Sequence, residues 1–115
     1  MLKEVIRGDT VILDLQLLDE NNNPVDLSFS QVVFTAKSDI NKPDSQAEIQ
    51  VIITHHIAPT QGKTRIKIPP SQTNNLIPYK VYYYDIQVSY SPDDIFTIYK
   101  GYFVCMPDIT KRGHE

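Results

Sequence analysis

Apolar and polar residues alternate along most of this chain, whereas the three-to-four-residue spacing of an amphipathic helix is hard to find. The clearest example is KTRIKI at 63–68, in which the three cationic residues are expected to face water and Thr64, Ile66 and Ile68 to face inward. The same period-two pattern predicts further strands at 10–17, 30–38, 47–54, 79–90 and 95–106. The chain is therefore expected to be almost entirely β.

Segments rich in Asn, Asp, Pro and Ser separate the predicted strands. DENNNPVD at 19–26 and DINKPDSQ at 39–46 contain residues that tolerate left-handed conformations or preset a turn. SPDD at 91–94 has proline at its second position, so 79–106 is predicted to be a β-hairpin. Gly101, inside the second strand of that hairpin, indicates a bulge or a close approach of the backbone.

Six or seven strands separated by turn signals favour an all-β, antiparallel β-sandwich of about seven strands, with a small closed barrel as the alternative. The one predicted helical turn lies near 70–76, where Pro70 suits a first helical turn and Ser71 is a candidate N-cap. The chain is expected to form a single domain over 1–108, followed by a short polar C-terminal tail at 109–115.

Composition narrows the function classes. With 41% apolar and 22% charged residues the chain is typical of a globular domain, and a net charge of -3 without a Lys/Arg cluster argues against a nucleic-acid partner. Cys105 is the only cysteine, which excludes an internal disulfide and a multi-cysteine zinc site and fits synthesis in the cytoplasm. No stretch approaches the ~20 apolar residues that span a bilayer, so no membrane association is expected.

Near the N-terminus, Arg7, Gly8 and Asp9 spell the tripeptide that adhesion receptors recognise in other proteins. An adhesive ligand needs the tripeptide at the tip of an exposed loop, whereas here it directly precedes a predicted strand. Gly8 permits a positive φ, and Asp9 can bond a backbone amide two residues on. We therefore interpret the tripeptide as a structural turn and keep adhesion as the lesser alternative.

Residues that could bind metal or carry acid–base chemistry do not form a recognisable pattern. His55 and His56 point to opposite sides of an extended segment, and His114 lies in the tail, so no metal site is expected. The two adjacent carboxylate pairs, Asp19 with Glu20 and Asp93 with Asp94, lie in predicted turns. A solvated turn does not separate the pKa values of two carboxyl groups, so neither pair is expected to act as a general acid and base.

A nucleophilic enzyme is not expected either. Cys105 falls at an inward position and has no histidine within the same hairpin to activate it. The chain contains neither a G-x-S-x-G elbow nor a glycine-rich phosphate loop, so no cofactor is expected.

Tyrosines concentrate in YKVYYYD at 79–85. Alternation places Tyr82 and Tyr84 in the core, where their hydroxyls can bond the backbone. We identify Tyr83, together with Tyr99, as a candidate protein interface, because tyrosine is favoured at interfaces.

Four short motifs are spaced along the chain: an R-G-D-T strand start, a turn ending in P-V-D-L, a strand entry of the form Leu-x-Pro-x-x-x-Y-x-Y-D, and a closing G-x-F segment followed by P-D. They occupy Arg7, Gly8, Asp9 and Thr10; Asn22, Pro24, Val25, Asp26 and Leu27; Leu76, Pro78, Tyr82, Tyr84 and Asp85; and Gly101, Phe103, Pro107, Asp108 and Thr110. In these motifs the chain resembles small immunoglobulin-like phage structural proteins, a group that includes the N-terminal domain of the phage baseplate upper protein.

The resemblance implies an immunoglobulin-like sandwich and a non-enzymatic virion component of the tail or baseplate, made in the bacterial host cytoplasm. Such a protein is expected to act by docking on other virion proteins or on further copies of itself. Two alternatives stay open. One is a head decoration or fibre-anchoring protein, and the other is a carbohydrate- or receptor-binding module that uses exposed tyrosines for stacking.

Overall fold

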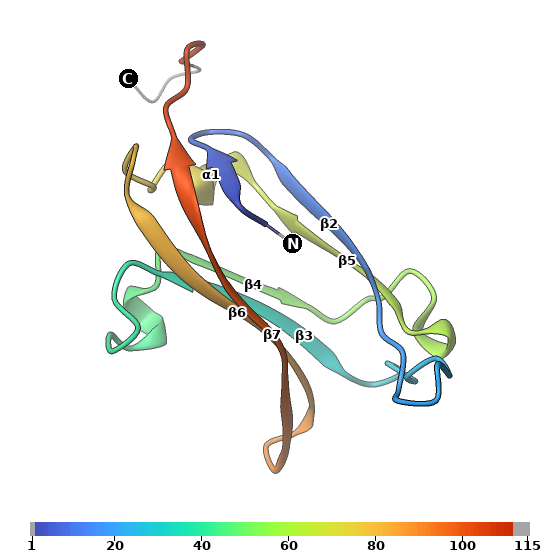
Figure 1. Cartoon of the computed structure of the whole chain (residues 1–115). Helices are drawn as coiled ribbons and strands as arrows, with labels where there is room; N and C mark the ends of the chain where they lie inside the picture. The colour runs from blue at the N-terminus through green and yellow to red at the C-terminus, as the bar shows by residue number, and fades with distance from the viewer. Residues whose placement is uncertain (1, 112–115) are drawn as a thin grey trace.

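In the computed structural model, which describes residues 2–111, two β-sheets pack face to face (Figure 1). One sheet has five strands in the order β1-β7-β6-β3-β4, and the other pairs β2 with β5. The strands of these residues are β1 (Glu4–Ile6), β2 (Val11–Gln16), β3 (Gln31–Lys37), β4 (Ile49–Ile53), β5 (Lys63–Ile68), β6 (Val81–Ser91) and β7 (Asp94–Met106). The helical elements are α1 (Pro70–Thr73) and two 3-10 turns, η1 (Asp44–Gln46) and η2 (Pro59–Gln61).

The predicted all-β sandwich is confirmed, including its seven strands and the short helical turn after position 69. The closed-barrel alternative is wrong, because no pairing joins the two sheets in the described part of the chain. The strand order is immunoglobulin-like: a β2–β5 pair faces a sheet whose centre is the β3, β6, β7 trio. No helix within residues 2–111 is long and apolar enough to cross a bilayer.

Side-chain alternation builds the core as the sequence predicts. In β5 the cationic residues are exposed, while Thr64, Ile66 and Ile68 are buried. β3 and β6 alternate in the same way, and opposite residues of an antiparallel pair share a face, so their inward side chains meet in one apolar layer. That layer includes Val32, Phe34, Ala36, Tyr82, Tyr84, Ile86 and Val88.

The predicted hairpin is also confirmed, with Pro92 and Asp93 as its two loop residues. Gly101 lies opposite Tyr84, and a Cβ atom on it would sit 3.1 Å from the Tyr84 ring. The predicted close approach is therefore present at Gly101, while the nearby bulge falls earlier in β7, between Thr97 and Tyr99.

Two features differ from the sequence-based prediction. β1 was not predicted, since three residues carry too little pattern, and it pairs in parallel with Val104–Met106 rather than antiparallel. β6 begins at Val81 rather than at Tyr79, because Pro78 and Tyr79 form a turn in which the N–H of Lys80 donates to the carbonyl of Ile77 (3.2 Å) and Tyr79 has φ 67°.

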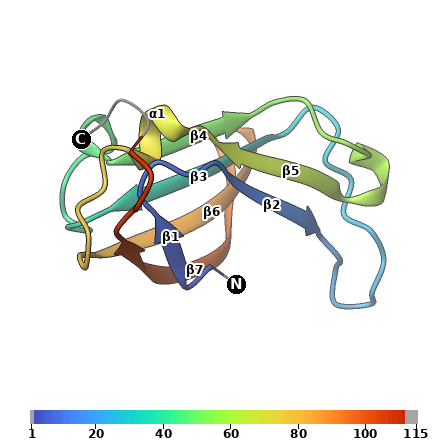
Figure 2. The same cartoon turned by 90° about the horizontal axis from the view of Figure 1, so that it is seen from above.

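The molecule is elongated, about 45 × 28 × 22 Å, and its two ends differ. We call the end that contains α1, the β1–β2 turn and Met106 the closed end. The open end contains the hairpin tip at 92–93 and the loop 17–30. In Figure 1 the hairpin tip and the far ends of β2 and β5 diverge. Figure 2 shows the loop after β2 at the opposite end of the molecule from α1.

Candidate interaction surfaces

The tripeptide at residues 7–9 connects β1 to β2 and so crosses from one sheet to the other. The N–H of Asp9 donates to the carbonyl of Ile6 (3.1 Å), and Gly8 has φ 85°, as the third position of a type II turn needs. The carbonyl of Asp9 accepts from the Thr73 hydroxyl (2.8 Å), which ties the turn to α1. The tripeptide is thus a turn anchored on both sides, and Asp9 contributes through its backbone.

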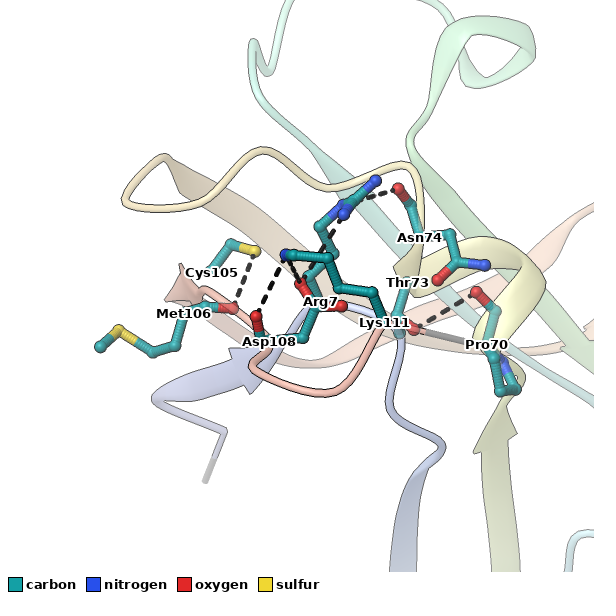
Figure 3. Close-up of polar contacts among 8 residues, drawn as sticks. All are labelled: Arg7, Pro70, Thr73, Asn74, Cys105, Met106, Asp108 and Lys111. Atoms are coloured by element: carbon teal, nitrogen blue, oxygen red, sulfur yellow. Dashed lines mark hydrogen bonds and ion pairs between the residues drawn. The ribbon is translucent and has the colours of Figure 1, made fainter. Parts of the chain in front are cut away.

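Arg7 is directed into a polar cluster at the closed end (Figure 3). Its Nε donates to the carbonyl of Asn74 (3.3 Å), and a terminal nitrogen lies 3.6 Å from Oδ1 of Asp108. Lys111 Nζ approaches the same oxygen at 3.4 Å. The Asp108 side chain is only 5% exposed, and a buried carboxylate needs compensating charge. Arg7 therefore fixes the start of the C-terminal segment, and its guanidinium is not presented at a loop tip.

The histidines are separated as the sequence predicts. His55 is exposed, whereas His56 bridges β5 and the start of β3. In a neutral ring Nε2 of His56 donates to the carbonyl of Ser30 (3.0 Å), which leaves Nδ1 to accept from the Thr64 hydroxyl (2.8 Å). His114 lies outside the described residues. Within 2–111, no three His, Cys, Asp or Glu residues gather into a potential metal site.

Both carboxylate pairs lie in exposed turns, as predicted. Asp19 accepts from the backbone N–H groups of Asn21 (2.8 Å) and Asn23 (2.9 Å), so it organises the turn in which Asn22 has φ 63°. Asp93 and Asp94 are exposed at the tip of the hairpin. These carboxylates therefore order loops and contribute negative charge to the open end.

Cys105 is fully buried at the closed end of the core. Burial raises the pKa of its thiol, and nearby Arg7 offsets this only in part. A thiol that stays protonated and shielded packs as a small apolar side chain.

The core tyrosines anchor the backbone through their hydroxyls. The N–H of Ile77, five residues before Tyr82, donates to the Tyr82 hydroxyl (2.8 Å), in the manner of the tyrosine corner of immunoglobulin-like sandwiches. The N–H of Leu2 donates to the Tyr84 hydroxyl (3.2 Å), and the Tyr84 ring stacks on Phe34. Burial raises the pKa of both tyrosines. Both residues therefore serve the fold.

Tyr83 lies on the outer face of the five-stranded sheet, opposite Tyr102 of β7. The two side chains are 47% and 64% exposed. Beside Tyr83 is a hollow of about 380 Å³ whose polar lining includes Lys37, Asp44, Asp85 and Lys100. Lys37 and Asp44 form an ion pair (2.8 Å), while burial raises the pKa of Asp85.

Tyr99, the second candidate interface residue, lies on the inner face, where its ring stacks on Tyr84. The structure therefore does not bring Tyr83 and Tyr99 together. Tyr99 instead contributes to a groove of about 600 Å³ at the open end, between β2 with its following loop and the hairpin. Leu15, Leu17 and Val25, from β2 and the loop after it, line one side of this groove. Phe96, Ile98 and Tyr99 of β7 line the other side.

Sequence reasoning missed the exposure of several large apolar residues. Phe96 is 56% exposed although it lies opposite Val88, which is buried. Phe29 is fully exposed and has φ 63°, a conformation that is unfavourable for a bulky side chain. Alternation identifies which face a residue occupies, but not whether another strand covers that face.

These features describe a small all-β sandwich with one sealed end and one apolar, open end. No protein-family model matches the chain, and no curated protein matches it in sequence.

Proposed function

We propose that the protein is a non-enzymatic structural component of a phage virion, in the tail or baseplate, and that it acts by protein–protein assembly. The observation that carries this proposal is the set of motifs, from Arg7 to Thr110, that resembles small immunoglobulin-like phage structural proteins. The all-β sandwich is consistent with that resemblance.

The surface offers the contacts that such assembly needs. Stable protein interfaces are centred on apolar and aromatic anchors. The open end exposes Leu18, Phe29, Ile95 and Phe96, and the outer face of the large sheet exposes Tyr83 and Tyr102. Partners are other virion proteins or further copies of the chain.

The test is to locate the protein in purified particles. Particles produced by the strain that encodes the chain are analysed by mass spectrometry and labelled with gold-conjugated antibody. Gold at the tail end, with a constant copy number per particle, is the expected result. Gold on the capsid supports the head decoration alternative, and absence of the protein from intact particles overturns the proposal.

A carbohydrate-binding module is the second candidate, and the neighbouring Tyr83 and Tyr102 favour it because aromatic side chains stack on sugar rings. The adjacent hollow supplies carboxylate and ammonium groups that bond hydroxyls. Titration of cell-wall glycans against the wild type and Tyr83→Ala separates the candidates: a glycan that binds the wild type and not the variant favours the module, and no binding removes it.

A further inference from the structure

The two sheets of the sandwich differ in width, and the difference leaves part of the inner face uncovered. The larger sheet has five strands and the smaller has two. On β7, Phe103 at the closed end is fully buried, whereas Phe96 on the same face is 56% exposed. The smaller sheet therefore does not cover the first half of β7.

The uncovered region is the groove of about 600 Å³ at the open end. Its floor includes Ile86 and Val88, and its walls are the apolar residues of β2 and β7 named above. A volume of this size accommodates several side chains of a partner. Exposed apolar surface of this kind marks an interaction site in a folded domain.

Both walls of the groove are strands with an unpaired edge. β2 pairs only with β5 among the described strands, and β1 pairs with β7 only at Val104–Met106. The N–H of Leu17 donates to Gly62 on the β5 side (2.8 Å). Backbone direction alternates along a strand, so the N–H and C=O groups of Ile12, Asp14 and Gln16 point to the free edge of β2. Free strand edges are templates for an added strand.

Charge distinguishes between the strands that could add there. The two segments that flank the groove, 18–30 and 88–98, contain no Lys or Arg, and their acidic residues are Asp19, Glu20, Asp26, Asp93 and Asp94. Tyr90 links the two segments, since its hydroxyl donates to the Asp26 carbonyl (2.7 Å). The hairpin of a second copy would bring like charges together, whereas a strand with basic residues near its ends complements them.

We propose that the open end binds an extended strand of a partner protein, which pairs with the free edge of β2 and places alternate apolar side chains on Phe96, Ile98 and Tyr99. Lys or Arg residues near the ends of that strand face the acidic loops. This inference rests on the proposed assembly function and deepens it by naming the surface and the chemistry of the partner segment.

The probe is a displayed library of random dodecapeptides, selected on the wild-type protein after removal of binders to Phe96→Ser. The expected enriched peptides have apolar residues at alternate positions and Lys or Arg near their ends. Failure to enrich any peptide, or enrichment of peptides without alternation, overturns the proposal.

A synthetic copy of an enriched peptide then tests geometry and charge. Proline at its central position is expected to weaken binding at least tenfold, because it removes a backbone donor. Phe96→Ser is expected to weaken binding by about tenfold or more, as truncation of a central aromatic anchor does. Ile40→Ser is the matched control, since Ile40 is exposed outside the groove and its loss should leave affinity unchanged. Bound peptide should protect the amides of Ile12, Asp14 and Gln16 from hydrogen exchange, and protection elsewhere contradicts the proposal.

Light scattering identifies the rival occupant. If the wild type dimerises and the Phe96→Ser variant is monomeric, the groove binds a second copy of the chain. That result would overturn the proposal that it binds a strand of another protein. The strand-binding proposal and the virion proposal can fail separately. If the protein is absent from particles but selects alternating peptides with basic ends, only the virion role is refuted. If it is present in particles but selects no such peptides, only the strand-binding proposal is refuted.

Discussion

The two phenylalanines of β7 show how differently the two ends of the sandwich are built. Phe103 at the closed end is fully buried, stacks on Tyr82 and belongs to the core cluster that also contains Val5 of β1 and Cys105. Phe96 at the open end lies on the same face of the same strand, yet more than half of it is exposed. Alternation treats the two phenylalanines alike, so the difference comes from which part of β7 the smaller sheet covers. The closed end therefore contributes more of the packing that stabilises the fold, whereas the open end carries the proposed binding surface.

The largest expected effect is that of removing the buried ring. Phe103→Ala should lower the free energy of unfolding by about 3–5 kcal/mol, because it leaves a cavity among packed aromatic rings. Phe96→Ala should change it by less than about 1 kcal/mol, since its ring gives up little burial on truncation. Urea unfolding followed by circular dichroism measures both. Equal losses for the two variants would show that the open end is sealed in solution.

A second comparison uses the hydroxyls of two tyrosines. Tyr82→Phe leaves the partly buried N–H of Ile77 without its acceptor and should cost about 1–2 kcal/mol, the lower part of the range for an unsatisfied buried donor. Tyr90→Phe removes the bond to the Asp26 carbonyl at the exposed open end and should cost less than about 0.5 kcal/mol. Thermal unfolding of the two single variants measures the difference, and a larger loss for Tyr90→Phe would reverse the assignment of the ends.

The β1–β2 turn gives the third comparison. Gly8→Ala forces a Cβ atom into a residue with φ 85° and should cost about 1–2 kcal/mol. Asp9→Ala keeps the carbonyl that accepts from Thr73 and should stay within about 0.5 kcal/mol of the wild type. Both are measured by urea unfolding, and a cell-attachment assay on the folded Asp9→Ala variant tests adhesion directly. Loss of attachment in that variant would revive the adhesive alternative.

Much of the fold was predictable because alternation and turn chemistry are local. The hairpin, the inward set of β5 and the left-handed Asn22 all follow from neighbouring residues. β1 was not predictable, because its three residues are held by Val104–Met106, far away in sequence. Where tertiary pairing decides, a short segment carries no signal of its own.

The candidate site residues follow the same rule: local alternation predicts a residue's position only where tertiary structure does not change the register. Tyr83 was predicted to face outward and does, because its neighbours in β6 alternate strictly. Tyr99 could not be placed from sequence, since the bulge opposite Ile86 and Gln87 shifts the phase of β7 between Phe96 and Tyr99. The groove could not be predicted from the sequence for a further reason. It forms where β2 diverges from β7, and the alternation of apolar and polar residues does not determine the relative paths of two strands.

The smallest expected effect concerns the 38–48 loop at the closed end, which Glu48 fixes. One carboxylate oxygen accepts from the Ser38 N–H (2.8 Å), and the other accepts from the Ser38 hydroxyl (3.0 Å) and pairs with Lys42. Burial alone would raise the pKa of Glu48, but the bonds from Lys42 and Ser38 hold it below its ordinary value of 4.5. Because the folded pKa is the lower one, this stabilisation is complete above about pH 5 and is lost as the pH falls through the folded pKa.

Glu48→Gln should therefore be less stable than the wild type at pH 7, by about 1 kcal/mol or less since the pair is partly screened. The gap should narrow toward pH 3, because protonation of the Glu48 carboxylate removes the charge that distinguishes the two side chains. Asp93→Asn at the exposed hairpin tip is the matched control and should track the wild type at both pH values. Urea unfolding at the two pH values measures the three proteins. A gap that widens on acidification would mean that the fold stabilises the protonated form of Glu48, which contradicts the bonds that lower its pKa.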